Sequence, residues 1–86
     1  MSSPPAKASP VVLVTGASSG IGLACCSQLA ASGRKVYGAS RRIPAGTPWP
    51  HLAMDVTDAA SVERAVAEVL AREGQIDAVV HSAGVS

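Results

Sequence analysis

Residues 14–22 read VTGASSGIG and place three glycines, Gly16, Gly20 and Gly22, between an apolar run and a helical pattern. Phosphate binds well at a helix N-terminus, because unpaired backbone N–H groups and the helix dipole point toward it. Glycine leaves that backbone accessible and permits a positive φ angle. In this spacing Gly16 would turn the chain, Gly20 would admit a pyrophosphate and Gly22 would allow close helix packing. The stretch therefore predicts a dinucleotide-phosphate site.

The residues on either side of the glycines predict a strand and a helix. Residues 11–15, VVLVT, are apolar at successive positions, which is typical of a strand buried on both faces of a parallel sheet. Ile21, Cys25 and Leu29 recur every four residues, and Gly33 follows as a stop signal. We therefore expect an amphipathic helix directly after the glycines.

A P-loop for nucleoside triphosphates is the main competing motif, and a plain strand-to-helix turn is the simplest alternative. The P-loop needs a lysine followed by serine or threonine after its last glycine, whereas Leu23 and Ala24 follow Gly22 here. Three hydroxyl side chains in the loop could bind phosphate or brace the turn: those of Thr15, Ser18 and Ser19. Context and spacing favour the dinucleotide motif.

The rest of the chain alternates between strands and helices. We expect strands over residues 35–40, 51–55 and 76–81, with a proline-rich loop over 41–50. A second helix is expected between a cap at Thr57 or Asp58 and a stop at Gly74, with Val62, Val66, Val69 and Leu70 on its apolar face. Helices between strands predict an α/β fold: a Rossmann-type, doubly wound parallel sheet in the order 3-2-1-4.

The predicted sheet stops short of the usual size. Doubly wound sheets of this kind have about six strands, so we expect this one to be truncated after the fourth, which would remain an edge. Residues 1–10 are rich in proline and serine and are expected to be a flexible lead-in. Residues 11–86 would form a partial dinucleotide-binding domain, with one helix on each face of the sheet.

The pattern T-G-x-x-x-G-I-G at residues 15–22 resembles the cofactor signature of the short-chain dehydrogenase/reductase family. Asp55 with Val56 after the third strand, and HSAG at residues 81–84 after the fourth, agree with it in order and distance. The resemblance implies that Asp55 contacts the adenine and that the Ser82–Gly84 turn borders the adenine ribose and diphosphate. His81 and Ser82 stand where the family usually has two asparagines. Considered alone, Asp55 would be read as a turn residue and His81 as a hydrogen-bonded strand end.

The end of the second strand indicates which nicotinamide cofactor is bound. NAD sites commonly place an acidic residue there to bond the ribose 2′-hydroxyl, but this chain has Ser40, Arg41 and Arg42 and no acid before Asp55. Arginine can bind a 2′-phosphate through charge-assisted hydrogen bonds. NADP is therefore preferred to NAD, with a merely solvated arginine pair as the alternative.

The expected cofactor-binding residues lie at or just after the ends of the four predicted strands. They are Thr15, Gly16, Ser18, Ser19, Gly20, Ile21, Gly22, Ser40, Arg41, Arg42, Asp55, Val56, Ser82, Ala83 and Gly84.

No catalytic residue can be assigned. The family resemblance implies a general acid/base tyrosine in Tyr-x-x-x-Lys, but Tyr37 is the single tyrosine and Arg41 stands four residues later. The favoured function is an NADP(H)-dependent oxidoreductase acting on a carbonyl or alcohol, present as its N-terminal cofactor-binding part and inactive alone. The alternative is a truncated, non-catalytic nucleotide-binding protein.

Composition excludes several other classes. All five charged residues in 1–50 are basic, whereas residues 51–86 hold six acids and two arginines, so the glycine-rich half attracts anions. The basic residues lack an aromatic platform, which argues against nucleic acid. No apolar run could span a membrane, and no metal site is predicted. The adjacent Cys25 and Cys26 favour a reduced, cytoplasmic setting. The resemblance suggests a homo-oligomer at full length.

Overall fold

The computed structural model describes residues 9–18 and 20–82. The predictions for Ser19, Ala83 and Gly84, and nearly all of the lead-in, lie outside these residues. The elements follow one another as β1 (Val11–Thr15), α1 (Gly20–Ala31), β2 (Lys35–Ser40), β3 (His51–Ala53), α2 (Ala59–Glu73) and β4 (Ala78–His81). All pairings are parallel and the strand order is β3-β2-β1-β4. The predicted Rossmann-type α/β fold is confirmed.

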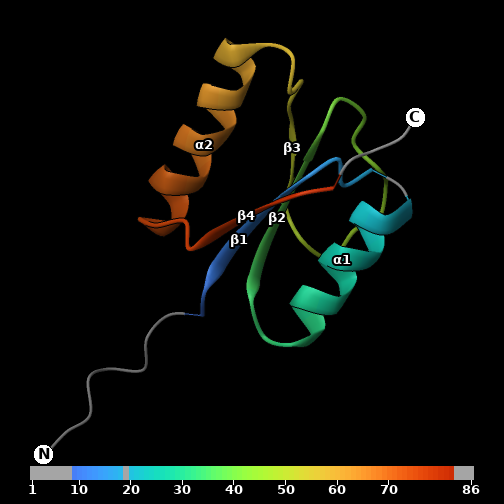
Figure 1. Cartoon of the computed structure of the whole chain (residues 1–86). Helices are drawn as coiled ribbons and strands as arrows, with labels where there is room; N and C mark the ends of the chain where they lie inside the picture. The colour runs from blue at the N-terminus through green and yellow to red at the C-terminus, as the bar shows by residue number, and fades with distance from the viewer. Residues whose placement is uncertain (1–8, 19, 83–86) are drawn as a thin grey trace, which may run out of the picture.

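The two helices lie on opposite sides of the sheet (Figure 1). Every residue of β1 is buried, and its side chains alternate between the two layers. Val11 and Leu13 pack in the cluster that includes Val69 of α2, whereas Val12 and Val14 pack in the cluster with Cys26 of α1. The central strand is therefore covered on both faces, as its unbroken apolar run predicts.

The buried face of α1 differs from the predicted one. Gly22 and Cys26 are its buried residues, while the side chain of Ile21 is 82% exposed. The carbonyl oxygen of Gly16 lies where a Cβ on Gly22 would stand, so only a glycine can face the turn. The predicted inward series is therefore wrong at Ile21, and Cys26 rather than Cys25 is buried, whereas Leu29 packs against the core as predicted.

Both ends of α2 are capped by hydrogen bonds from the residues that flank it. The Asp58 carboxylate accepts from the backbone N–H groups of Ala60 and Ser61, which selects Asp58 rather than Thr57 as the cap. Gly74 has a φ angle of 79° and donates its N–H to the Leu70 carbonyl. Ser61, Ala65 and Val69 are buried, whereas the predicted core residue Leu70 is 44% exposed.

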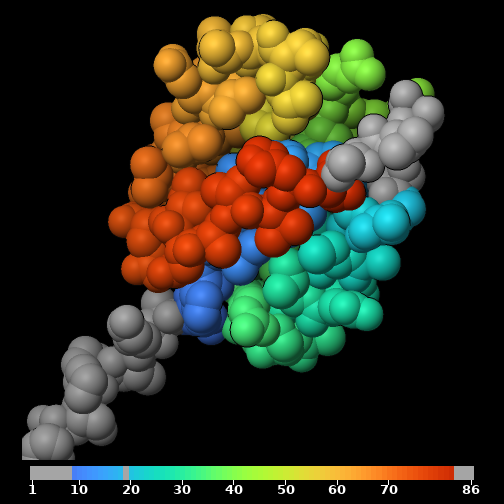
Figure 2. Space-filling model, viewed as in Figure 1, coloured from blue at the N-terminus to red at the C-terminus, as the bar shows by residue number. Residues whose placement is uncertain are grey.

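The outer strands are shorter than predicted. The strand expected over residues 51–55 ends at Ala53, and the one expected over 76–81 begins at Ala78. Asp77 instead uses its carboxylate to accept from the backbone N–H of Val11, at 2.7 Å. Residues 76–82 cross the visible surface between the two helices without cover (Figure 2), and Val79 is 46% exposed. The predicted edge position of the fourth strand is thus confirmed.

Candidate functional site

The parallel sheet brings the carboxyl ends of all four strands to one edge. Thr15 at the end of β1 is in register with Ala39 of β2 and His81 of β4, and Ser40 is in register with Ala53 of β3. The segments that follow these strands therefore start side by side. They contain the described residues that the sequence predicts to bind the cofactor.

The glycine turn is packed too tightly for side chains at two of its positions. Gly16 has a φ angle of 68°, and a Cβ there would collide with the Ser82 carbonyl oxygen. A Cβ on Gly22 would meet both Gly16 and the Ser82 side chain. At Gly20, by contrast, no described atom lies within 4 Å of a Cβ position. The turn thus packs against the end of β4 and leaves its backbone open at Gly20.

Thr15 connects the start of the glycine turn to the end of β4 through hydrogen bonds. Its side chain is buried, and its Oγ1 lies 3.0 Å from Nδ1 of His81. The Ser82 backbone N–H also donates to the Thr15 carbonyl, at 3.1 Å. His81 and Ser82 therefore connect the end of β4 to the end of β1.

The end of β2 carries two exposed cations. Arg41 and Arg42 are exposed, and neither forms an ion pair with any residue in 9–18 or 20–82. The buried Ser40 hydroxyl donates to the Arg42 carbonyl and lies 2.7 Å from Nε2 of His51. The charge of this pair is available to an anion arriving at the edge.

Asp55 forms a turn of its own after β3. Its Oδ1 accepts from the side-chain hydroxyl and the backbone N–H of Thr57, at 2.7 and 2.9 Å. These bonds, with a smaller contribution from the charge of Arg41, lower the pKa of the Asp55 carboxyl. Its backbone N–H donates to Oγ of Ser61. Asp55 is therefore an ionised turn residue on the same edge as Arg41.

Three exposed apolar side chains surround this edge. Ile21, Val56 and Ile43 are 82%, 62% and 54% exposed, and each follows the carboxyl end of a different strand. Exposed apolar side chains also occur elsewhere in the chain, at Leu70 and Val79, so what distinguishes these three is their position after the strand ends. Ile21 and Val56 were predicted site residues. Ile43, between Arg42 and Pro44, was not among the predicted site residues.

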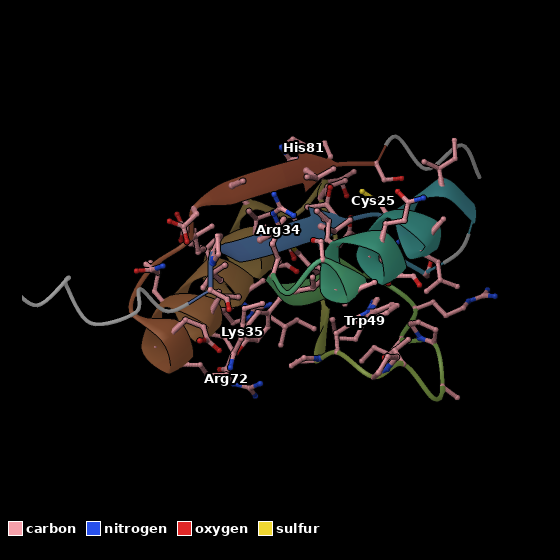
Figure 3. All side chains as sticks on the ribbon, turned by 90° about the horizontal axis from the view of Figure 1, so that it is seen from below. Cys25, Arg34, Lys35, Trp49, Arg72 and His81 are labelled. Carbon is pink, nitrogen blue, oxygen red and sulfur yellow. The ribbon has the colours of Figure 1, made fainter. Side chains whose placement is uncertain are left out.

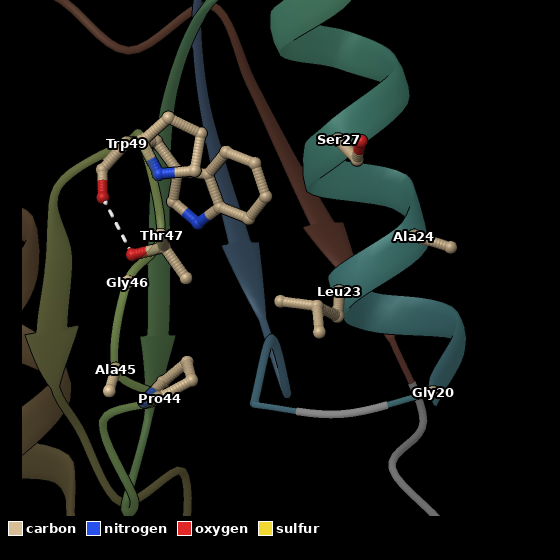
Figure 4. A pocket seen from close by; sticks show the side chains of 10 residues that line it. Gly20, Leu23, Ala24, Ser27, Pro44, Ala45, Gly46, Thr47 and Trp49 are labelled. Carbon is tan, nitrogen blue, oxygen red and sulfur yellow. Dashed lines mark hydrogen bonds between the residues drawn. The ribbon is translucent and has the colours of Figure 1, made fainter.

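A groove runs along α1 beside the same edge (Figure 4). The segment 41–50 connects β2 to β3 without a helix, and its residues 44–49 form the wall opposite Gly20, Leu23 and Ser27. Trp49 packs against the α1-side core, and its buried Nε1 has no partner among the described residues. The proline-rich loop thus occupies the layer that a crossover helix would fill.

Tyr37 lies away from this site. It is 2% exposed, and its hydroxyl donates to Glu73 at 2.5 Å. Burial, followed by this hydrogen bond, raises the tyrosine pKa. The Arg72 guanidinium stands 5.9 Å from the ring centre, near Lys35 in Figure 3. Tyr37 therefore holds β2 to the end of α2.

The described residues lack both a metal-binding cluster and a membrane-spanning helix. Residues 9–18 and 20–82 contain no group of three or more His, Cys, Asp or Glu side chains arranged to hold a metal ion. Within the same residues, neither helix has the length and apolarity needed to cross a membrane.

Comparisons with known protein families and with curated proteins point to the same family. A family model described as short chain dehydrogenase matches residues 10–86. The 3-oxoacyl-(acyl-carrier-protein) reductase MabA of Mycobacterium avium is 42% identical over 82 residues, which cover 95% of this chain and 32% of that protein.

Two solved structures share the fold at similar identity. The aldohexose dehydrogenase of Thermoplasma acidophilum superposes with a TM-score of 0.85 at 34% identity, over 90% of this chain and 30% of its own. Actinorhodin polyketide ketoreductase with NADPH gives a TM-score of 0.79 at 34% identity, over 88% and 33%. Three curated relatives, the MabA protein among them, are matched over only 28% to 34% of their own length.

Proposed function

This chain belongs to the short-chain dehydrogenase family, and on that premise we propose that it forms the NADP(H)-binding part of an oxidoreductase. The reaction would transfer a hydride between the nicotinamide and a small carbonyl or alcohol substrate. The observation that carries the proposed cofactor is the pair Arg41 and Arg42, exposed at the end of β2, with no acidic residue in that segment and no ion pair among the described residues.

The glycine turn fits a dinucleotide. Its backbone is open at Gly20, while Gly16 and Gly22 are held in place by contacts within the chain. The first turn of α1 carries no charged side chain, since residues 20–24 are glycine, isoleucine, glycine, leucine and alanine. A pyrophosphate would therefore meet N–H groups rather than a competing carboxylate.

The arginine pair favours the phosphorylated cofactor. A 2′-phosphate would be held by charge-assisted hydrogen bonds, each contributing about 1.5–3 kcal/mol. The 2′-hydroxyl of NAD would find no carboxylate at the end of β2 to bond it. NAD is therefore the less favoured cofactor.

The remaining predicted residues receive roles from their positions. Ile21 and Val56 supply apolar surface beside the edge, and Asp55 after β3 and Ser82 after β4 stand at its two opposite ends. Thr15 and Ser18 support the turn, in which Ser19 is also expected to act. Ala83 and Gly84, also predicted to bind the cofactor, lie outside the described residues. In this arrangement the chain binds and orients the cofactor.

Catalysis is assigned to no residue of this chain. The bound nicotinamide would supply the site that accepts or donates the hydride. The only tyrosine in the sequence is buried against Glu73, which favours a second candidate, a non-catalytic nucleotide-binding protein. An assay of NADPH oxidation with carbonyl substrates separates the two, and we expect binding without turnover from the 86-residue chain alone.

A cellular setting, a class of partner and an oligomeric state are proposed with the function. The free cysteines, Cys25 and Cys26, support a reducing, cytoplasmic setting. The partner would be a small molecule rather than nucleic acid or membrane, and a homo-oligomer is expected for a full-length reductase.

The test of the cofactor compares two binding affinities. Replacing both arginines, Arg41→Ala with Arg42→Ala, should weaken NADPH binding at least about tenfold and leave NADH within about twofold, because only NADPH carries the 2′-phosphate. Arg34→Ala removes an exposed charge near the opposite ends of the strands and serves as the control. Unchanged NADPH affinity in the double variant would refute the proposed role of the pair.

A further inference from the structure

The imidazole of His51 is packed against the end of β2. Its Nε2 lies 2.7 Å from the Ser40 hydroxyl oxygen. A Cβ on Gly38 would stand 2.6 Å from its Nδ1, so the ring lies directly on the glycine backbone. His51 is therefore held between a backbone that leaves it room and a hydroxyl that bonds it.

The hydrogen bonds of Ser40 determine which nitrogen of His51 carries the proton. A serine hydroxyl has one hydrogen, and the Arg42 carbonyl that Ser40 contacts can only accept. The Ser40 oxygen is then left to accept from Nε2–H of His51. Nε2 therefore carries a proton, and in the neutral ring this leaves the lone pair on Nδ1.

The environment of Nδ1 supports this assignment. The atom is buried and has no partner among the described residues. A proton there would be a buried donor without an acceptor, which is costly. Burial accordingly lowers the pKa of His51. The side chain therefore acts as a neutral donor to Ser40 near neutral pH.

Ser40 in turn shapes the segment that carries the two arginines. Its carbonyl accepts from the Met54 N–H at 2.9 Å, which fixes it to the segment after β3. Its hydroxyl closes the local turn by donating to the Arg42 carbonyl. The directions in which Arg41 and Arg42 leave the sheet depend on this turn.

We propose that His51 is a positioning residue for recognition of a ribose 2′-phosphate. By donating from Nε2, it keeps the Ser40 hydroxyl on the Arg42 carbonyl and so holds the turn of Arg41 and Arg42 in the shape that receives a phosphate monoester. His51 itself does not touch the ligand. This inference rests on the proposed NADP-binding function.

The test measures binding of NADPH and NADH to variants of the whole chain. His51→Leu removes the donor, and we expect NADPH binding to weaken about five- to tenfold, as for one lost hydrogen bond, with NADH changed less than about twofold. His51→Gln keeps an N–H donor at similar reach and should restore the preference for NADPH. Leu52→Met, in the same strand but packed on the opposite face, is the control.

A double-mutant cycle tests the route through the serine. Ser40→Ala should weaken NADPH binding, and adding His51→Leu to it should cause no further loss, because both act through one hydrogen-bonded unit. Additive losses would overturn the inference. Equal weakening of NADPH and NADH by His51→Leu would also overturn it and leave the cofactor assignment intact.

Imidazole nitrogen chemical shifts give a readout that needs no cofactor. We expect the wild-type chain to show a neutral His51 with its proton on Nε2. A proton on Nδ1 would overturn the inference, and this result decides the matter even if His51→Leu does not fold. A wild-type chain that binds NADH as tightly as NADPH would instead refute the proposed cofactor, and the inference with it.

Discussion

The two ends of the sheet differ in how their charged groups are used. At the amino ends of the strands, Glu73 accepts from Tyr37 and lies 4.0 Å from Lys35, and Asp77 accepts from the Val11 N–H. At the carboxyl ends, Arg41 and Arg42 have no ion-pair partner among the described residues. One end thus uses its polar groups to hold the elements together, whereas the other leaves its two arginines without ion pairs among the described residues.

Tyr37 and Gly22 illustrate the same difference between a residue that stabilises the fold and one that shapes the candidate site. Tyr37 resembles a catalytic candidate only by its residue type, since its hydroxyl is already engaged in the packing of β2 on α2. Gly22 has no chemistry of its own, yet its lack of a side chain permits the turn to exist. Substitutions at these two positions should therefore separate stability from binding.

The largest effect is expected from Gly22→Ala. Alanine normally stabilises a helix interior relative to glycine by about 1 kcal/mol. Here its Cβ would collide with Gly16 and Ser82, so we expect the free energy of unfolding to fall by about 1–3 kcal/mol. Both NADPH and NADH should bind at least about tenfold more weakly, because the whole turn must shift.

Urea unfolding and binding titrations measure the two effects of Gly22→Ala. Gln28→Met changes an exposed side chain of the same helix outside the groove, at similar helix propensity, and should change neither. A Gly22→Ala chain that is stabilised and still binds both cofactors would show that the turn is not packed as described.

A smaller effect, confined to stability, is expected from Tyr37→Phe. The change keeps the buried ring but removes the hydroxyl that donates to Glu73. Losing a hydrogen bond to a charged acceptor should lower the free energy of unfolding by about 1.5 kcal/mol. The affinity for NADPH should stay the same, because Tyr37 lies away from the carboxyl edge. A clear loss of affinity would break the separation between the two ends.

The smallest effect is a dependence on alkaline pH. Because the pKa of Tyr37 is raised in the folded chain, the unfolded chain loses its proton first. The stability from this residue is present below about pH 10 and is lost as the pH rises above that value through the folded pKa. Tyr37→Phe lacks this loss, so its unfolding free energy should approach that of the wild type in alkali.

The comparison with Tyr37→Phe also removes a second alkaline titration. Burial raises the pKa of the Cys26 thiol to about 11, but this contribution is common to both chains. Urea unfolding of both proteins from neutral to alkaline pH measures the difference. A gap between them that stays constant with pH would contradict the assigned role of the Tyr37 hydroxyl.

Much of the fold could be predicted because local patterns determine it. The unbroken apolar run at residues 11–15 indicated a doubly covered strand, and Asp58 and Gly74 carry the cap signals of α2. The inward face of α1 was predicted incorrectly in its first turn, since apolar spacing pointed to Ile21 while the contact with Gly16 required Gly22. That contact joins residues whose fit depends on the three-dimensional turn.

The candidate site was predicted in outline for the same reason. Motif spacing identified the glycines, Arg41 and Asp55, because the parallel topology places the ends of strands together. The hydrogen bonds of His51 to Ser40 and of Ser61 to Asp55 were missed. Each joins a residue on one element to a residue on another, at a register that a single sequence does not specify.

The central claim is that the carboxyl end binds NADP(H) while the amino end only stabilises the fold. Backbone amide chemical shifts recorded while NADPH is added test it most directly. The account predicts saturable shifts at residues 15–22, 40–42, 55–56 and 82, with Lys35, Glu73 and Asp77 unmoved. Shifts confined to those three residues and their neighbours, or no saturable shift with NADPH, would contradict it.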